Sequence, residues 1–176
     1  MPRENSELLI QIKKFLRNAP IITKKRKSSI KDFNPNDFKK STSKKMKMFN
    51  DLFSGKKLAS DVNIDDYVDR IAAISNMKGY LLYVAAYLFF KVITKPDLFT
   101  VYEDYTIKLF SSCVYLAHKV YLDQQYTAKF MSKLLGIPKK KLNRRELFLC
   151  GGNVFNFKFQ VDQKNLEKFI KFLKTF

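Results

Sequence analysis

The feature that most constrains the fold is a nearly continuous apolar stretch from Tyr80 to Ile93, interrupted by one lysine. A helix that is apolar on almost every side is packed by other helices all round, so this stretch predicts a central helix. Residues 104–122 repeat this character and contain small residues that allow close helix approach, namely Ser111, Ser112 and Ala117. With 17 Phe, 9 Tyr and only 5 Gly, the chain favours an all-α fold.

Apolar residues at helical spacing predict further helices beside this pair. One begins near residue 63, where Asn63 or Asp65 can cap it, and runs towards Gly79. Another covers residues 126–135 and ends at Gly136, and the next runs from Pro138 to the glycines at 151 and 152. Between about residues 63 and 152 the sequence therefore predicts one unit of five helices, without an internal repeat.

Flanking segments add shorter amphipathic helices. Apolar spacing predicts helices over residues 6–17, ended by Pro20, over 45–53, ended by Gly55, and over about 162–174. Residues 20–47 are rich in Lys, Ser, Asn and Thr and show no sustained period, so they predict a flexible linker. The expected division is a basic N-terminal region over 1–58, the five-helix unit over 59–158 and a C-terminal helix over 159–176.

The charge of the chain is strongly positive and unevenly distributed. Lys and Arg number 34 against 16 Asp and Glu, for a formal net charge of +18. Most of the excess lies in residues 1–60, which include the run Lys24, Lys25, Arg26 and Lys27. This run is a candidate nuclear import signal, a nonspecific nucleic-acid contact or a solvated segment, and the residues alone leave these alternatives open.

Few residues of the chain suit metal binding or nucleophilic chemistry. Cys113 and Cys150 lie in apolar runs, where free thiols act as small hydrophobes, so neither a disulfide nor a zinc site is expected. His118 is the single histidine, and a structural or surface role suits it better than a catalytic one. The most apolar segment, 80–90, is too short to span a bilayer. These features predict a soluble intracellular protein without cofactors.

The chain contains five segments in a fixed order, namely Ile64 to Ile71, Ala117 to Lys119, Lys133 to Pro138, Leu142 to Leu149 and Asn153 to Phe157. Together they resemble the cyclin box, and the P/U-type cyclins of the yeast phosphate-pathway class in particular. Ile64 to Ile71 is similar to their I-x-x-Y-L-x-R-I opening, and Ala117 to Lys119 resembles the Ala-x-Lys that closes the third helix of the box. Lys133 to Pro138 resembles the A-K-V-G-G-I-S stretch, and Leu142 to Leu149 the L-N-x-x-E-x-x-F-L motif. Asn153 to Phe157 is similar to the D-F-x-L exit, so the resemblance spans about residues 62–158.

The resemblance implies a regulatory subunit that binds and activates a cyclin-dependent protein kinase and has no catalytic residues of its own. Lys119 and Glu146 are then expected to bind polar backbone groups around the mobile regulatory helix of the kinase. Aromatic and aliphatic residues beside them are expected to supply desolvated contacts. The kinase-binding residues expected in addition are Tyr121, Leu122, Tyr126 and Arg70.

Two departures from the family pattern affect this expectation. The second helix of the family carries an Asp that pairs with the first-helix Arg, but here Phe89 stands at that place. Arg70 must therefore be solvated, paired with Asp66 or Asp69, or turned to the kinase, because an isolated buried guanidinium is costly. The M-R-A-I-L patch by which cell-cycle cyclins recruit substrates is also missing, which agrees with the P/U type.

Two other functions remain open on the same architecture. One is a nucleic-acid-binding transcription factor of cyclin fold, which the net charge supports, although such factors have two repeats and a zinc ribbon. The other is a cyclin-like adaptor that binds a kinase without activating it. The expected partner is a cyclin-dependent kinase, bound by a monomer in the nucleus or cytoplasm. The pathway, whether cell cycle, phosphate sensing or polarity, is not readable from the residues.

Overall fold

The structure, a computed structural model, is built of α-helices. It describes residues 2–29, 47–49, 51–53, 62–74, 79–94, 103–123, 125–151, 154–156, 158 and 160–176, without the side chains of 2–6, 23–29, 74, 103 and 104. No strand occurs among these residues. The helices are α1 (Pro2–Ser29), α3 (Ile64–Ile74), α4 (Gly79–Ile93), α5 (Glu103–Tyr121), α6 (Ala128–Leu135), α7 (Lys139–Cys150) and α8 (Gln163–Leu173).

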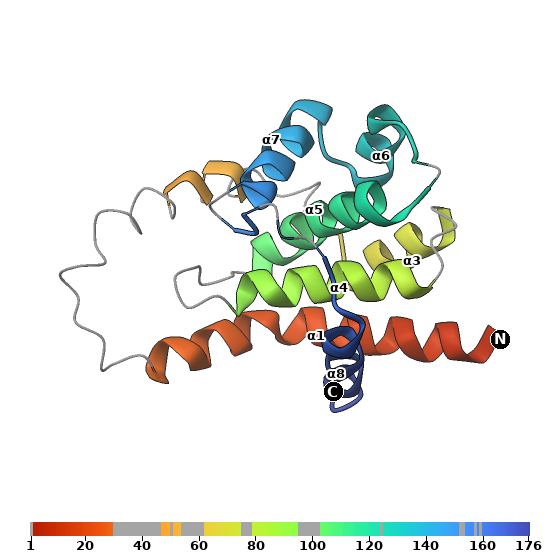
Figure 1. Cartoon of the computed structure of the whole chain (residues 1–176), viewed down its shortest axis with the longest axis vertical. Coiled ribbons are helices and arrows are strands. Elements are labelled where there is room, and N and C mark those ends of the chain that lie inside the picture. The colour runs from red at the N-terminus through yellow and green to blue at the C-terminus, as the bar shows by residue number, and fades with distance from the viewer. Residues whose placement is uncertain are drawn as a thin grey trace.

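Helices α4 and α5 form the centre of the molecule and pack along each other (Figure 1). Most side chains of α4 are buried, which explains why it is apolar on nearly every side. In α5, the buried hydroxyls of Ser111 and Ser112 donate to the carbonyls of Ile107 and Lys108, one turn earlier in the helix. These short side chains therefore satisfy their own polarity inside the helix, and the Ser111 hydroxyl lies against the Tyr67 hydroxyl of α3.

The cap of α3 and its buried face agree with the sequence prediction. Asn63 Oδ1 accepts a hydrogen bond from the backbone N–H of Asp65 at 3.0 Å, so Asn63 is the N-cap. Tyr67, Val68 and Ile71 are buried on one side of the helix. Helix α3 is described from Ile64 to Ile74 and the next described helix begins at Gly79, so the predicted end of α3 near Gly79 falls on residues outside the description.

A tight corner joins α6 to α7. Thr127 caps α6, and Gly136 ends it in the left-handed conformation at φ 66° and ψ 25°. Pro138 then precedes the first residue of α7, which runs to Cys150. Five helices, α3 to α7, thus lie between residues 64 and 150, as the sequence predicted.

The first helix is longer than predicted. The expectation that it ends before Pro20 is wrong, because α1 continues through Pro20 to Ser29. A proline inside a helix removes one backbone hydrogen bond and costs about 3 kcal/mol. The apolar face of α1 packs against α3, α4, α5 and α8, and this burial outweighs that cost. The buried residues of that face are Leu8, Ile12, Phe15, Leu16 and Ala19.

An aromatic cluster joins α1 and α4 to the C-terminal helix. The Phe15 ring lies within 6.3 Å, centroid to centroid, of five other rings, four of them edge-on and one tilted. These rings belong to Phe89, Phe90, Phe169, Phe172 and Phe176. The C-terminal amphipathic helix was predicted, and its partners, α1 and α4, emerge only in three dimensions (Figure 1).

The basic N-terminal region is described only in part. The prediction of a flexible segment over 20–47 is wrong for residues 20–29, which are helical, and its remainder up to residue 46 lies outside the described residues. Residues 47–49 and 51–53 are helical, as predicted, and Phe49 and Phe53 are buried against Phe148 of α7. The Arg145 guanidinium also reaches this segment, donating from Nε to the Leu52 carbonyl at 2.9 Å.

Candidate functional site

Two charged side chains distant in sequence meet where α5 ends. Lys119 lies in the last turn of α5 and Glu146 in the middle of α7, and these two helices are in contact. The Lys119 Nζ donates to Glu146 Oε1 at 2.6 Å. The side chains are 37% and 18% exposed, respectively, so the pair lies at the surface without being fully solvated. The structure thus joins the two residues that the sequence singled out.

The surroundings of this pair keep the lysine charged. Burial lowers the pKa of Lys119, but the hydrogen bond and the negative charge of Glu146 outweigh that effect and raise the pKa above its usual value. The ammonium also lies 5.2 Å from the centroid of the Tyr115 ring, a cation–π distance. Cys150 follows Glu146 by one turn, and burial together with the Glu146 charge raises the pKa of its thiol to about 11. This thiol is therefore protonated near neutral pH.

Tyr126 lies in the loop that follows α5, and a buried histidine holds this loop. The Nε2 atom of His118 accepts a hydrogen bond from the Tyr126 backbone N–H at 2.7 Å. The two rings are nearly parallel, at 11°, with centroids 5.3 Å apart. The Gln125 amide also donates to the Lys119 carbonyl at 2.7 Å. The loop after α5 is thus fastened to the end of the helix that carries Lys119.

His118 itself has a structural position, as expected. Its side chain is buried, and burial followed by the charge of Lys119 lowers its pKa. Because Nε2 accepts a hydrogen bond, the neutral ring carries its proton on Nδ1, for which the described residues offer no acceptor. A neutral imidazole in this place supports the loop that carries Tyr126.

The other predicted contact residues lie in different surroundings. Tyr121 is half-buried, and its hydroxyl oxygen accepts a hydrogen bond from the Val161 backbone N–H at 2.9 Å, just ahead of α8. Leu122 is half-buried against the core. Tyr126 is 36% exposed, and its ring packs on Phe130 with centroids 4.7 Å apart. Of the three, Tyr126 presents the most surface, while Tyr121 anchors the segment before α8.

Arg70 lies apart from this group. It is exposed on α3, and its guanidinium is 5.1 Å from the centroid of the Tyr67 ring. Asp69 does not pair with it, because that carboxylate binds Lys13 of α1 at 2.7 Å. Arg70 is thus not an isolated buried guanidinium, and it makes a cation–π contact to Tyr67, while its contact with a kinase stays a prediction. No hydrogen bond or ion pair of the described residues links Arg70 to Lys119 or Glu146.

Two exposed apolar residues that follow the charged pair in the sequence were missed by the sequence analysis. Val120 is 44% exposed and follows Lys119, and Leu147 is 72% exposed and follows Glu146. The signal for Leu147 was its place on the helix, since it falls off the apolar stripe that Leu142 and Leu149 define. Exposed large apolar side chains of this kind are typical of protein interfaces.

The predicted import signal lies at the end of α1. Lys24, Lys25, Arg26 and Lys27 belong to its last turns, and their side chains are outside the description. The structure therefore leaves this prediction untested.

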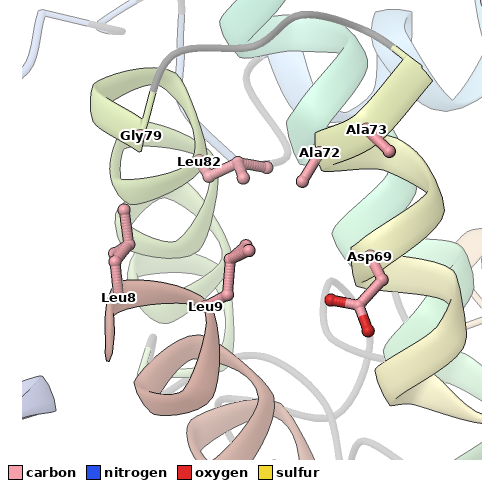
Figure 2. A pocket seen from close by; sticks show the side chains of 7 residues that line it. All are labelled: Leu8, Leu9, Asp69, Ala72, Ala73, Gly79 and Leu82. Carbon is pink, nitrogen blue, oxygen red and sulfur yellow. The ribbon is translucent and has the colours of Figure 1, made fainter. Parts of the chain in front are cut away.

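A hollow lies between α1, α3 and α4, with a cavity volume of about 410 Å³ (Figure 2). Leucines of α1 and α4 face it from one side, and the short side chains of Ala72 and Ala73 leave the space open on the other. Its one charged side chain is Asp69, which also binds Lys13. The lining residues are Leu8, Leu9, Asp69, Ala72, Ala73, Gly79 and Leu82. With a single carboxylate and otherwise apolar walls, this hollow holds no paired acid and base.

Comparison with known families agrees with the fold and with the motifs around this site. The family model described as Cyclin matches residues 6–158, which is most of the chain and includes most of α1 as well as α3 to α7. The chain therefore belongs to the cyclin family, whose members are regulatory proteins rather than catalysts. No protein among the curated ones matches the chain.

Among the described helices, none is both long and apolar enough to cross a membrane.

Proposed function

We propose that this cyclin binds and activates a cyclin-dependent protein kinase, and that it docks through the face around Lys119 and Glu146. The observation that carries the proposal is the meeting at 2.6 Å of these two residues, which lie on different helices and are 27 positions apart in sequence. Val120 follows Lys119 in the chain, and Tyr126 lies in the loop that Gln125 fastens to the Lys119 carbonyl. Both side chains are partly exposed. A charged pair with apolar neighbours matches the composition of protein interfaces, in which desolvated anchors supply most of the affinity.

The paired state leaves both groups able to bind a partner. An ammonium has three N–H donors, and Lys119 donates one of them to Glu146 Oε1. The other carboxylate oxygen, Oε2, remains outside that bond. Backbone carbonyls of a kinase segment can therefore accept from Lys119, and backbone N–H groups can donate to Glu146, in charge-assisted bonds. The existing pair holds the two side chains at a fixed separation, which reduces the entropy lost on binding.

Activation follows as a population shift. A cyclin that binds the active conformation of the kinase more tightly than the inactive one moves the kinase towards activity. A differential of about 5.5 kcal/mol converts a kinase from almost wholly inactive to almost wholly active. The catalytic residues all belong to the kinase, and this chain contributes only binding energy.

Affinity purification followed by a kinase assay tests the proposal. The tagged full chain is compared with Lys119→Ala, Glu146→Ala and the control Lys164→Ala, which removes an exposed lysine from α8. We expect a kinase to co-purify with the wild type and the control, and both site variants to lose most of the kinase. The proposal fails if no kinase co-purifies, or if both site variants bind and activate as well as the wild type.

The same experiment separates an activator from an adaptor. An activator raises the activity of the purified kinase towards a peptide substrate in proportion to the complex formed. An adaptor binds equally well and leaves that activity unchanged. The similarity of residues 133–149 to P/U-type cyclins supports an activator of that class, and phosphate-dependent kinase activity in cells would test the subtype.

We further propose that residues 24–27 act as a nuclear import signal. The support is the density of positive charge in that run. A fluorescent fusion of the full chain should be nuclear, and replacement of the four basic residues by alanine should spread it through the cytoplasm. An unchanged distribution would refute the import role.

A further inference from the structure

Six positive side chains lie on the α6–α7 corner without a negative partner. All six are exposed, and no ion pair of the described residues includes any of them. The one acidic residue within this pair of helices, Glu146, is already bound to Lys119. We call this surface the α6–α7 basic face, and its cations are Lys129, Lys133, Lys139, Lys140, Lys141 and Arg144.

The N-terminus of α7 adds to this positive charge. Lys139, Lys140 and Lys141 are the first three residues of the helix, and no acidic side chain lies in its first turn. The N-terminus of a helix carries a partial positive charge, so cations there are unfavourable for the isolated protein. No side chain caps this end either, because the N-cap is Pro138. The corner therefore has a strongly positive potential that a negative group could relieve.

The helical spacing of α7 places an apolar side chain among these cations. Positions four and three residues apart share a face of a helix, so Lys140, Arg144 and Leu147 form one stripe. The stripe lies opposite the buried residues Leu142 and Leu149. Leu147 is 72% exposed, the highest value among the large apolar residues of the described chain. The stripe therefore combines positive charges with one exposed apolar side chain.

We propose that the α6–α7 basic face docks an acidic segment of a partner protein, one that places an apolar side chain on Leu147 among its carboxylates. Carboxylates supply the missing partners of the six cations, in charge-assisted bonds. A side chain on Leu147 removes from water the most exposed large apolar group. Nucleic acid is the weaker fit, because phosphates leave Leu147 uncovered and this face offers no exposed aromatic stripe for bases.

This surface is distinct from the docking site proposed above. Glu146 points to Lys119, whereas Leu147 is the next residue and lies about 100° further round the helix. A partner on the basic face therefore need not compete with a kinase at the Lys119–Glu146 pair. The inference does not depend on the proposed function, and its test needs no kinase.

The test measures fluorescence anisotropy of the full chain with a labelled peptide of Asp and Glu around one central Leu, at physiological ionic strength. The double variant Lys140→Ala with Arg144→Ala removes two charges from the stripe. Its matched control is Lys164→Ala with Lys168→Ala, because those lysines are exposed at the same two positions of α8, the second and the sixth. Both variants keep the basic N-terminal region and reach the same net charge.

We expect the α7 double variant to weaken peptide binding at least about fivefold and the α8 control to leave it unchanged. Leu147→Ser should weaken binding of this peptide at least about threefold, and should not affect a peptide whose Leu is replaced by Ser. Equal losses in the α7 and α8 variants would overturn the proposal, since only net charge would matter. A duplex DNA that binds more tightly than the peptide, and is lost in the α7 variant alone, would also overturn it in favour of nucleic acid.

Discussion

The ring of Phe15 on α1 meets the ring of Phe89 on α4 edge to face, with centroids 5.8 Å apart and planes at 89°. Both side chains are fully buried. Phe89 stands where related sequences were expected to carry an Asp for the first-helix arginine, and here that position serves the packing of α1 instead. Arg70 is accordingly exposed, over the ring of Tyr67.

From this contact we expect that placing the family's Asp at position 89 destabilises the protein. Phe89→Asp places a carboxylate in an aromatic core, where Arg70 does not reach it, and should lower the free energy of unfolding by about 4 kcal/mol or more. Urea denaturation followed by circular dichroism measures this change. Phe89→Leu is the control and should cost about 1 to 2 kcal/mol. If the Asp variant is as stable as the Leu variant, Arg70 has found the carboxylate and our account of its position is wrong.

A buried phenol links α3 to two other helices. The Tyr67 hydroxyl donates to the Leu135 carbonyl of α6 at 2.8 Å and shares a hydrogen bond with Ser111 of α5. Burial raises the pKa of Tyr67 to about 12, so the phenol is neutral at physiological pH. Tyr67→Phe leaves the buried Leu135 carbonyl without its donor, while Ser111 keeps its bond to Ile107, and should cost about 1 to 3 kcal/mol in thermal or urea unfolding. Tyr80→Phe, at a side chain that is 57% exposed, should change stability by less than about 0.5 kcal/mol.

Two ion pairs tie α1 to α3, and we expect them to contribute little to stability. The Arg17 guanidinium donates to both carboxylate oxygens of Asp65, from Nε at 3.1 Å and from Nη2 at 2.7 Å. Because the Arg17 side chain is 54% exposed, a double-mutant cycle with Arg17→Ala and Asp65→Ala should give a coupling of about 0.2 to 1 kcal/mol that weakens in high salt. Phe15→Ala should cost about 3 to 5 kcal/mol. A coupling as large as the Phe15 effect would show that charge, not apolar burial, holds α1.

The buried histidine predicts a loss of stability in mild acid. Burial and Lys119 place the folded-state pKa of His118 below the unfolded value of 6.5, so the folded protein binds fewer protons than the unfolded one. Stability contributed by the neutral ring is therefore complete above pH 6.5 and is lost as the pH falls below it. Protonation also turns Nε2 into a donor, which breaks the bond from the Tyr126 N–H.

Melting temperatures measured from pH 7.5 down to 5 test this prediction against His118→Asn, whose side chain does not titrate. The wild type should lose stability over this range more steeply than the variant. Parallel curves would mean that His118 ionises in the folded protein as readily as in the unfolded one, contrary to its surroundings.

Much of the fold was predictable because local signals and tertiary packing agree between residues 63 and 150. The side chain of Asn63 caps α3, Gly136 ends α6 in a conformation that suits glycine, and the apolar stretch 80–93 is a central helix. Each of these signals acts over a few residues of chain, and such short-range physics can be read from spacing.

The first helix shows where local reading fails. Pro20 is a strong local signal for the end of a helix, yet α1 passes through it. The reason lies in α3, α4, α5 and α8, which cover the apolar face of α1 and compensate for the missing hydrogen bond. These helices lie far from Pro20 in the sequence, so the residues around Pro20 do not reveal them.

In the candidate site, too, the sequence predicted some features and only the packing of the helices decided others. Lys119 and Glu146 were singled out by resemblance, and their roles in kinase binding stay predictions, but their mutual contact depends on how α5 packs on α7. Arg70, grouped with them on the same grounds, lies apart on α3. Leu147 escaped notice because exposure depends on which face of α7 the other helices cover.

The sequence by itself determined that this chain is all-helical, that two apolar helices lie at its centre, and that cyclin-like motifs run through its second half. Helical periodicity and end signals are properties of neighbouring residues, so they needed no partner. Only the tertiary structure decided that α1 runs through Pro20, that Phe89 packs on Phe15 and that Lys119 binds Glu146. These relationships join residues far apart in the chain, whose energies exist only once the helices have packed.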